Sequence, residues 1–300
     1  MKVAAIVGVK DECDLIKPCL ERLWSIGVGP ILVVDDHSSD GTLNVIDNLS
    51  SRSPAPLART TFAHDFGQNL RIDGDVFGPF MRQHSPDWLL FIDADEFPIC
   101  VNNDLPAILA NSATPVLSIE RFNVPLTNDP FIPAHGAGSD VFLRAPLITS
   151  REVLNRTLLE ETPGHRWIMH RILPKLVCRP EQVAHLGSGW HSVTDSSGQS
   201  IPAHAADGVV IVHVPMTTPE RFVRKVDNAR EFFRRWADHY PGEAAWHWKR
   251  WVDLADRGLL AAEFEAQRMD ESTLMQLTER GAIARADAVL KKSMRVDAHC

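Results

Sequence analysis

Short apolar runs alternate with helix-patterned segments over the first hundred residues of this 300-residue chain. The clearest runs, residues 3–9, 30–34 and 88–92, are short and bounded by turn residues, as buried strands are. Apolar residues recur at helical spacing between the first two runs and again after Thr42, where Ser39 or Asp40 is expected to cap the helix. A weaker helix, interrupted by glycines, is expected over residues 67–83. This order predicts an α/β fold with a mostly parallel sheet flanked by helices.

The pattern changes after residue 113. Strand-like runs at 116–122 and 207–214 are separated by loops rich in Gly, Pro and His, and such loops usually carry substrate contacts. After Pro219 the apolar residues recur at helical spacing to the end of the chain. We therefore predict an α/β domain over residues 1–215 and a C-terminal helical extension over residues 216–300 that packs on it.

Composition excludes several classes of protein. The chain has 31 Lys and Arg against 39 Asp and Glu, a net charge of −8, which argues against a nucleic-acid-binding protein. Its 5 cysteines form no Cys-x-x-Cys pair, so neither a disulfide framework nor a cysteine zinc site is expected. No apolar run reaches the roughly 18 residues of a membrane helix. We expect a cytoplasmic protein, and the tryptophans among basic residues in the last third leave peripheral association with the inner face of the membrane open.

An Asp-x-Asp-Glu segment follows the apolar run at 88–92 and carries the most information about chemistry. Alternate side chains of a strand point the same way, so Asp93 and Asp95 are expected to reach one divalent cation together. Carboxylate ligands suit Mg²⁺ or Mn²⁺, whose remaining positions are often filled by substrate phosphates. The segment therefore predicts a metal and phosphate site at the carboxyl end of this strand.

A second acidic segment, residues 35–40, follows the run at 30–34. In an open α/β sheet, ligands bind at the carboxyl ends of the strands, so Asp36 is expected to face the same edge as Asp93. A carboxylate there is well placed to accept hydrogen bonds from a base N–H or a ribose hydroxyl. The alternative is that these residues only form a turn and cap the next helix.

Taken together, these segments resemble the family 2-like glycosyltransferases of the GT-A fold, which contain an Asp-x-Asp motif. The family opens with a strand and a (Lys/Asn)-(Asp/Asn)-Glu turn, continues with Asp-x-x-Ser-x-Asp-Gly-Thr, and then presents Asp-x-Asp-Glu-Phe. The matching segments occur here in the same order at 10–12, 36–42 and 93–97, and a strand ending in His with a following helix occurs at 212–225. The resemblance implies a GT-A-type, Rossmann-like sheet whose first domain binds a nucleotide-sugar donor and an acceptor.

The resemblance also assigns roles to individual residues. Asp93 would lie by the ribose and metal, and Asp95 would ligate the Mn²⁺ or Mg²⁺ that bridges the two phosphates. Arg71, expected on the helix over 67–83, would add a phosphate or ribose contact. The residues implied to line the nucleotide pocket are Lys10, Asp11, Glu12 and Asp36.

Two histidines and two acidic residues compete for the remaining roles. His213 ends the strand-like run at 207–214, and His191 lies in a Gly-rich loop; either is a candidate additional metal ligand. An inverting transfer needs a base for the acceptor's proton, but the Gln-x-x-Arg-Trp segment that often follows this base in the family is missing. Glu96 and Asp140 are the candidates for it.

The sequence thus predicts a metal-dependent glycosyltransferase. It would move a sugar from a nucleotide-diphosphate sugar to a hydroxyl of a glycan, a lipid-linked glycan or a small molecule, with inversion implied by the family. Two alternatives stay open. A sugar nucleotidyltransferase would also place carboxylates on a cation. It is expected to have a Gly-rich basic loop after its first strand, and residues 7–12 do not form one. A non-catalytic glycan-binding or docking module of the same fold would have no need of the metal ligands.

Overall fold

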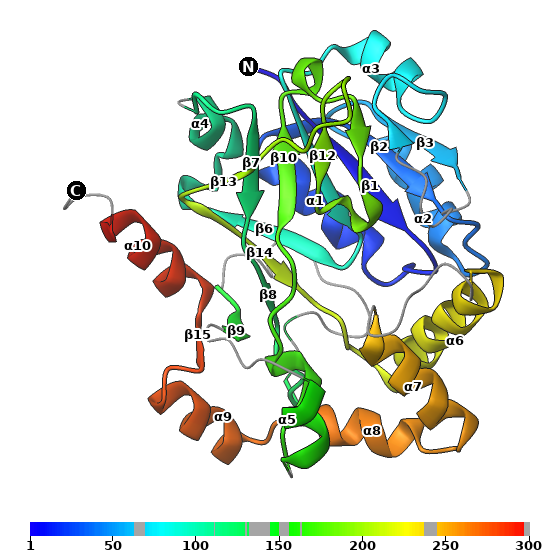
Figure 1. The fold of residues 1–300 in the computed structure, drawn as a ribbon, viewed down its shortest axis with the longest axis vertical. Coiled ribbons are helices and arrows are strands. Elements are labelled where there is room, and N and C mark those ends of the chain that lie inside the picture. The colour runs from blue at the N-terminus through cyan, green and yellow to red at the C-terminus, as the bar shows by residue number, and fades with distance from the viewer. Residues whose placement is uncertain are drawn as a thin grey trace.

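A computed structural model of the chain describes residues 1–62, 70–110, 112–129, 131, 145–149, 156–162, 164–236 and 245–296. Its centre is a sheet of seven strands (Figure 1). In spatial order these are β13 (His204–Ala205), β7 (Val116–Ile119), β10 (Lys175–Cys178), β5 (Trp88–Asp93), β1 (Val3–Val9), β2 (Val28–Asp35) and β3 (Leu57–Thr61). The neighbours β5, β1, β2 and β3 are all parallel, whereas β10 is antiparallel to β5 and β7. The α/β fold class predicted from the alternating pattern is therefore confirmed.

The strands at the centre of the sheet are apolar on both faces because helices or loops cover both. On one side α1 (Ile16–Ser25) and α2 (Thr42–Ser50) pack against the sheet, with α4 (Leu105–Ala110) nearby. The other side is closed by α3 (Gly78–His84) and a small sheet of β12 (Val193–Thr194), β11 (His185–Leu186) and β4 (Leu70–Arg71). The core strands are almost fully buried, as expected of a parallel sheet covered on both faces.

A second small sheet begins directly after the Asp-x-Asp segment. It contains β6 (Glu96–Cys100), β14 (Val209–His213) and β8 (Arg121–Asn123), in that order. Because β14 pairs with both neighbours, His213 lies opposite Glu96 on one side and Asn123 on the other. The tertiary structure thus brings the end of the late strand to the Asp-x-Asp segment.

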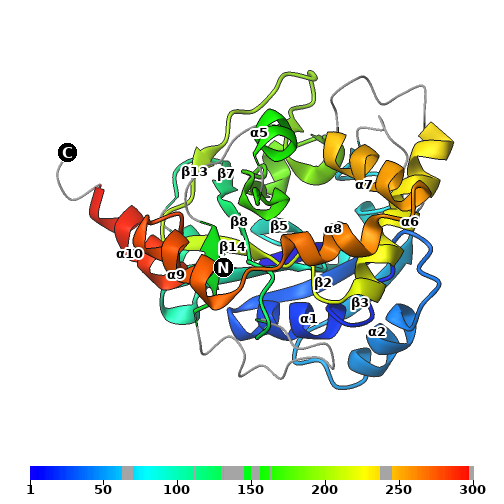
Figure 2. The same cartoon turned by 90° about the horizontal axis from the view of Figure 1, so that it is seen from below.

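The C-terminal helices pack on this body, as Figures 1 and 2 show. In Figure 2, α1 and α2 lie together on one side of β2, and α7 lies on the opposite side. The strand β15 (Ile283–Arg285) pairs with β9 (Leu147–Thr149), so the end of the chain returns to the body. The helices of the second half are α5 (Arg156–Glu161), α6 (Pro219–Trp236), α7 (Trp246–Asp256), α8 (Leu260–Gln267), α9 (Glu271–Glu279) and α10 (Ala286–Val296). The division at residues 215 and 216 stays a prediction.

Local structure differs from the sequence prediction at three places. The helix expected over 67–83 is wrong for residues 70–77. Residues 70–71 form β4, which pairs with the distant β11, and α3 begins only at Gly78. The run at 116–122 is broken at Glu120 into β7 and β8, which belong to different sheets. The N-cap of α2 is Gly41, and Asp40, one residue earlier, accepts the Thr42 N–H at 2.9 Å.

Candidate functional site

A pocket of about 930 Å³ lies at the carboxyl ends of β1, β2 and β5. Parallel register brings these ends together, since Gly8 lies opposite both Val34 and Asp93. A pocket of this volume is at the upper end of the usual range for a small-molecule site. Its lining includes most of the residues predicted from the sequence: Lys10, Glu12, Asp36, Asp93, Asp95, His191 and His213.

The turn after β1 is held against the turn after β2. Lys10 Nζ donates to the Asp36 carbonyl at 2.7 Å. Asp11, which has a positive φ of 51°, accepts the Ser39 N–H at 2.6 Å with one carboxylate oxygen and the amide of Asn228 at 3.0 Å with the other. Asp11 therefore positions the loop and α6, whereas Lys10 and Asp36 face the pocket.

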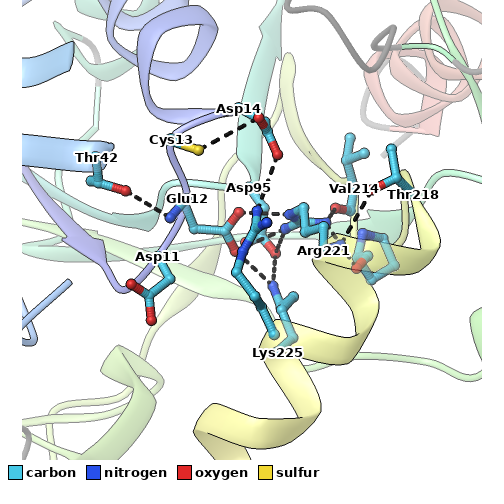
Figure 3. Close-up of polar contacts among 12 residues, drawn as sticks. Asp11, Glu12, Cys13, Asp14, Thr42, Asp95, Val214, Thr218, Arg221 and Lys225 are labelled. Atoms are coloured by element: carbon cyan, nitrogen blue, oxygen red, sulfur yellow. Dashed lines mark hydrogen bonds and ion pairs between the residues drawn. The ribbon is translucent and has the colours of Figure 1, made fainter. Parts of the chain in front are cut away.

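The turn after β1 also reaches a buried cluster of two carboxylates and two cations (Figure 3). Arg221, whose side chain is 0% exposed, donates from Nε and Nη2 to the two oxygens of Glu12 at 2.6 and 2.8 Å. The same Nη2 donates to Asp95 Oδ2 at 3.1 Å. Lys225, one turn further along α6, contacts Asp95 Oδ2 and donates to Glu12 at 3.0 Å. The cluster joins segments far apart in the chain at the rim of the pocket.

The charges in this cluster keep Asp95 ionised. Burial works against the carboxylate form, but the positive charges of Lys225 and Arg221 and a hydrogen bond from His213 outweigh it and hold the pKa of Asp95 well below its usual range. Asp95 is therefore a carboxylate at every physiological pH. It can act as a ligand for a cation or as a hydrogen-bond acceptor, but it is a poor proton donor.

A hydrogen bond fixes the orientation of His213. The Asn123 side-chain amide donates to the carbonyls of Ile168 and His170 at 3.0 and 3.3 Å, so its Oδ1 is the atom that accepts from His213 Nδ1 at 2.7 Å. His213 Nε2 then faces Asp95 Oδ2 at 3.5 Å. A proton or a metal ion between these two atoms would stabilise the arrangement.

The donor atoms of this pair fit part of the ligand shell of a divalent cation. A carboxylate oxygen from Asp95 and an imidazole nitrogen from His213 are ligand types that Mn²⁺ accepts. Within the part of the chain that the structure describes, no three His, Cys, Asp or Glu side chains gather into a fuller set. Such a cation would therefore take its remaining ligands from water and substrate phosphates.

Asp93 and Glu96 share a second cationic cluster below the pocket. Lys175, 1% exposed on β10, donates to Asp93 Oδ2 at 2.6 Å and lies 3.6 Å from Glu96. Glu96, which is 0% exposed, also pairs with Arg121 and accepts the backbone N–H of Asp93 at 2.8 Å. Glu96 does not line the pocket, so its surroundings favour a role in positioning Asp93. Asp93 points its carboxylate to Lys175, apart from the Asp95–His213 pair.

Three further predicted residues have different outcomes. His191 lines the pocket and hydrogen-bonds through Nδ1 to the Pro174 carbonyl at 2.7 Å; burial, with the charges of Lys175 and Arg121, lowers its pKa to about 4. Arg71 was expected on a helix but lies in β4, where it pairs with Asp73 at 2.7 Å, 59% exposed and outside the pocket lining. Asp140 lies outside the described residues.

Aromatic side chains of α6, α7 and residues 167–170 form a second wall of the pocket. Burial lowers the pKa of His170 to about 4 and that of His247 to about 3, so both imidazoles are neutral at pH 7. His247 stacks against Trp167 with ring centroids 4.9 Å apart. The rings of this wall that line the pocket are Trp167, His170, Phe222, Trp246, His247, Trp248 and Trp251.

Sequence motifs assigned a role to Lys10 but not to the four cations of the two clusters. Lys175 and Arg121 lie on strands whose partners are distant in the chain, and no local pattern marks them. Arg221 and Lys225 lie four residues apart just after the strand that ends in His213, and this helical spacing is the signal that was available.

In the described part of the chain, no helix is both long and apolar enough to cross a membrane.

Neither the known family models nor the curated proteins include a match to this sequence. Among solved structures the chain is similar to TarS 1-349 from S. aureus in complex with UDP-GlcNAc, with 18% identity and a TM-score of 0.42 over 78% of this chain and 67% of that one. TarS 1-349 in complex with UDP is 16% identical, with a TM-score of 0.40 over 78% of this chain and 66% of that one. Glucosyl-3-phosphoglycerate synthase from Mycobacterium tuberculosis, in complex with Mn²⁺, UDP and glucosyl-3-phosphoglycerate, is 14% identical, with a TM-score of 0.27 over 41% of this chain and 44% of that one. The chain spans about two thirds or less of the length of these structures.

Proposed function

We propose that this protein is a glycosyltransferase that moves a sugar from a nucleotide-diphosphate sugar to a hydroxyl acceptor. One observation carries the proposal: Lys10, Asp36, Asp95 and His213, which come from separate strand ends, converge on one pocket with room for a donor and an acceptor. Ligands of open α/β sheets bind at this edge. The motifs that resemble family 2-like glycosyltransferases supply these same residues.

The nucleotide would occupy the part of the pocket at the ends of β1 and β2. Gly8 and Asp36 line this part of the pocket, and the carboxylate of Asp36 is of the kind that accepts hydrogen bonds from a base N–H or a ribose hydroxyl. Lys10 holds the backbone of this turn through the Asp36 carbonyl. The diphosphate would then lie toward Asp95, where cations are concentrated.

The transfer breaks the bond between the anomeric carbon and the terminal phosphate oxygen, and both bonding electrons go to that oxygen. The leaving nucleoside diphosphate therefore gains negative charge, which positive groups at the site stabilise in the transition state. Lys225 and Arg121 both line the pocket and offer such groups. A divalent cation held by Asp95 and His213 would neutralise the same oxygens.

The acceptor hydroxyl would approach from the aromatic wall and form the new bond to the anomeric carbon as its proton passes to a base. Neutral His170 and His247 line this side, whereas Glu96 is buried in ion pairs. Because His170 and His247 line the pocket and Glu96 does not, an imidazole of this wall is better placed than Glu96 to reach the acceptor hydroxyl. Inversion at the anomeric carbon stays a prediction from the family resemblance.

Calorimetric titration of UDP, then GDP, with and without Mn²⁺, tests the proposal. Wild-type protein should bind one of the two more tightly with Mn²⁺, and Asp95→Asn should abolish this gain because it removes the charge but keeps the shape. Asp14→Asn is a matched control, since Asp14 pairs with Arg224 outside the pocket lining. Folded wild-type protein that binds neither nucleotide would defeat the proposal and favour the docking module.

The second alternative and the partners have tests of their own. Release of pyrophosphate from a nucleoside triphosphate and a sugar phosphate would identify a sugar nucleotidyltransferase. The donor sugar and the glycan or other acceptor would be found by product analysis after the base is known. Cytoplasmic location and association with the inner face of the membrane stay predictions, and co-sedimentation with anionic vesicles tests the second.

A further inference from the structure

Asp95 has two cationic partners from α6, and they differ in freedom. Arg221 is fully buried and is held by Glu12 and by the carbonyls of Val214 and Pro215 at 3.1 and 3.0 Å. It does not line the pocket. Lys225 makes its contacts to Glu12 and Asp95 through its terminal ammonium alone. Arg221 is therefore a fixed part of the fold, and Lys225 is not fixed in the same way.

The position of Lys225 on α6 puts it within the pocket. Phe222, Lys225, Ala229 and Phe232 lie three or four residues apart, on one face of the helix, and all line the pocket. The Lys225 side chain is 17% exposed. Its flexible stem allows the ammonium to turn from Asp95 toward a ligand without movement of the helix.

The charges of the cluster balance only while Lys225 stays on Asp95. Glu12 and Asp95 are matched by Arg221 and Lys225. Lys225 contacts the same oxygen, Oδ2, that faces His213 Nε2. A divalent cation bound between Asp95 and His213 would meet the ammonium at close range, where like charges repel strongly. The ammonium and a metal ion thus compete for one carboxylate oxygen.

We propose that Lys225 is a phosphate-binding residue that occupies the Asp95 carboxylate in the free protein and turns to the donor diphosphate when the nucleotide binds. This inference rests on the proposed function. Asp95 and His213 would then hold a divalent cation, which would supply the counter-charge of Asp95 in place of the ammonium. The ammonium then pairs with the diphosphate, which carries one more negative charge after the glycosyl group has left. Lys225 would therefore favour the leaving group over the intact donor.

Two binding measurements on Lys225→Met test the proposal. Without nucleotide, Mn²⁺ should bind the variant about tenfold more tightly than wild type by electron paramagnetic resonance, because the competing ammonium is gone. In saturating Mn²⁺, whichever of UDP and GDP binds wild type should bind the variant about tenfold more weakly by calorimetry, since a charge-assisted hydrogen bond to the diphosphate is lost. Lys225→Arg keeps the charge and should retain the nucleotide affinity in saturating Mn²⁺.

Arg224→Met is the matched control, because Arg224 is the neighbouring cation on α6 and pairs with Asp14 outside the pocket lining. Both affinities should stay at the wild-type value in this variant. Circular dichroism establishes that each variant is folded, and Lys225→Gln replaces Lys225→Met if the latter is not.

Failure of this proposal and failure of the proposed function give different results. Wild-type protein that binds neither nucleotide, with or without Mn²⁺, would defeat the proposed function itself. Nucleotide binding that Lys225→Met leaves unchanged in saturating Mn²⁺ would overturn the role of Lys225 alone. So would an Mn²⁺ affinity that Lys225→Met does not raise.

Discussion

Replacing Arg221 with methionine should destabilise the protein severely. Methionine has a similar length but no hydrogen-bond donors, and Arg221 makes five hydrogen bonds with its buried guanidinium. The change leaves Glu12 and Asp95, 5% and 4% exposed, with Lys225 as their remaining cation from α6. Removing one partner of a buried ion pair costs about 3–5 kcal/mol. That is a large part of the roughly 5–15 kcal/mol by which a folded protein is stable.

Urea unfolding followed by tryptophan fluorescence measures this loss. With a slope of about 3 kcal/mol per molar urea, the midpoint should fall by about 1–1.7 M. Arg224→Met is the control and should change stability by less than about 1 kcal/mol, because its ion pair with Asp14 is half-exposed. Combining Arg221→Met with Glu12→Gln should recover part of the loss, since one of the two uncompensated charges is then removed.

The pH dependence checks the electrostatic origin of the effect. In wild type the lowered pKa of Asp95 contributes stability that is present above the ordinary carboxyl pKa and is lost as pH falls through the folded value. Arg221→Met removes part of this contribution, so the stability difference between the two proteins should shrink as pH falls below about 4. A loss under about 1 kcal/mol at pH 7, or a loss independent of pH, would refute the reasoning.

Three further changes test the pocket and its wall. A Cβ on Gly8 would lie 3.0 Å from Trp190 and 3.1 Å from an oxygen of Asp93, so Gly8→Ala should weaken nucleotide binding about tenfold in calorimetry. His247 stays neutral in the folded protein until about pH 3, so wild type should lose stability as pH falls from about 6.5, and His247→Phe should reduce that slope by about 1.4 kcal/mol per pH unit. Trp251 is 2% exposed, so Trp251→Ala should lower the free energy of unfolding by about 3–5 kcal/mol, measured by urea unfolding.

Each of these predictions has a result that contradicts it. Unchanged nucleotide affinity in Gly8→Ala would mean that nucleotide binding does not depend on the positions of Trp190 and Asp93. Equal acid sensitivity of wild type and His247→Phe would mean that this imidazole takes up its proton in the folded protein as readily as in the unfolded chain. A loss below about 1 kcal/mol for Trp251→Ala would mean that the aromatic wall is not packed as described.

Local sequence pattern was sufficient where neighbours along the chain decide the structure. The strand predicted at residues 3–9 is β1, Val3–Val9, and the helix predicted between the first two strands is α1. Pattern failed at Arg71, because residues 70–71 pair with β11, and the gain from that long-range pairing is invisible in a helical window. The pattern also failed to show the break at Glu120, which divides the apolar run at 116–122 between β7 and β8 in two different sheets.

The sequence by itself determined that strand ends bearing Lys10, Asp36 and Asp93 meet at one edge, because parallel strands with short crossovers leave no other arrangement. Only the tertiary structure decided the electrostatics of that edge. Arg221 contacts Glu12 from 209 residues away in the chain. Such pairing depends on where a late helix packs, and no spacing rule extends that far. The carboxylates were therefore predictable from local motifs, whereas their counter-charges were not.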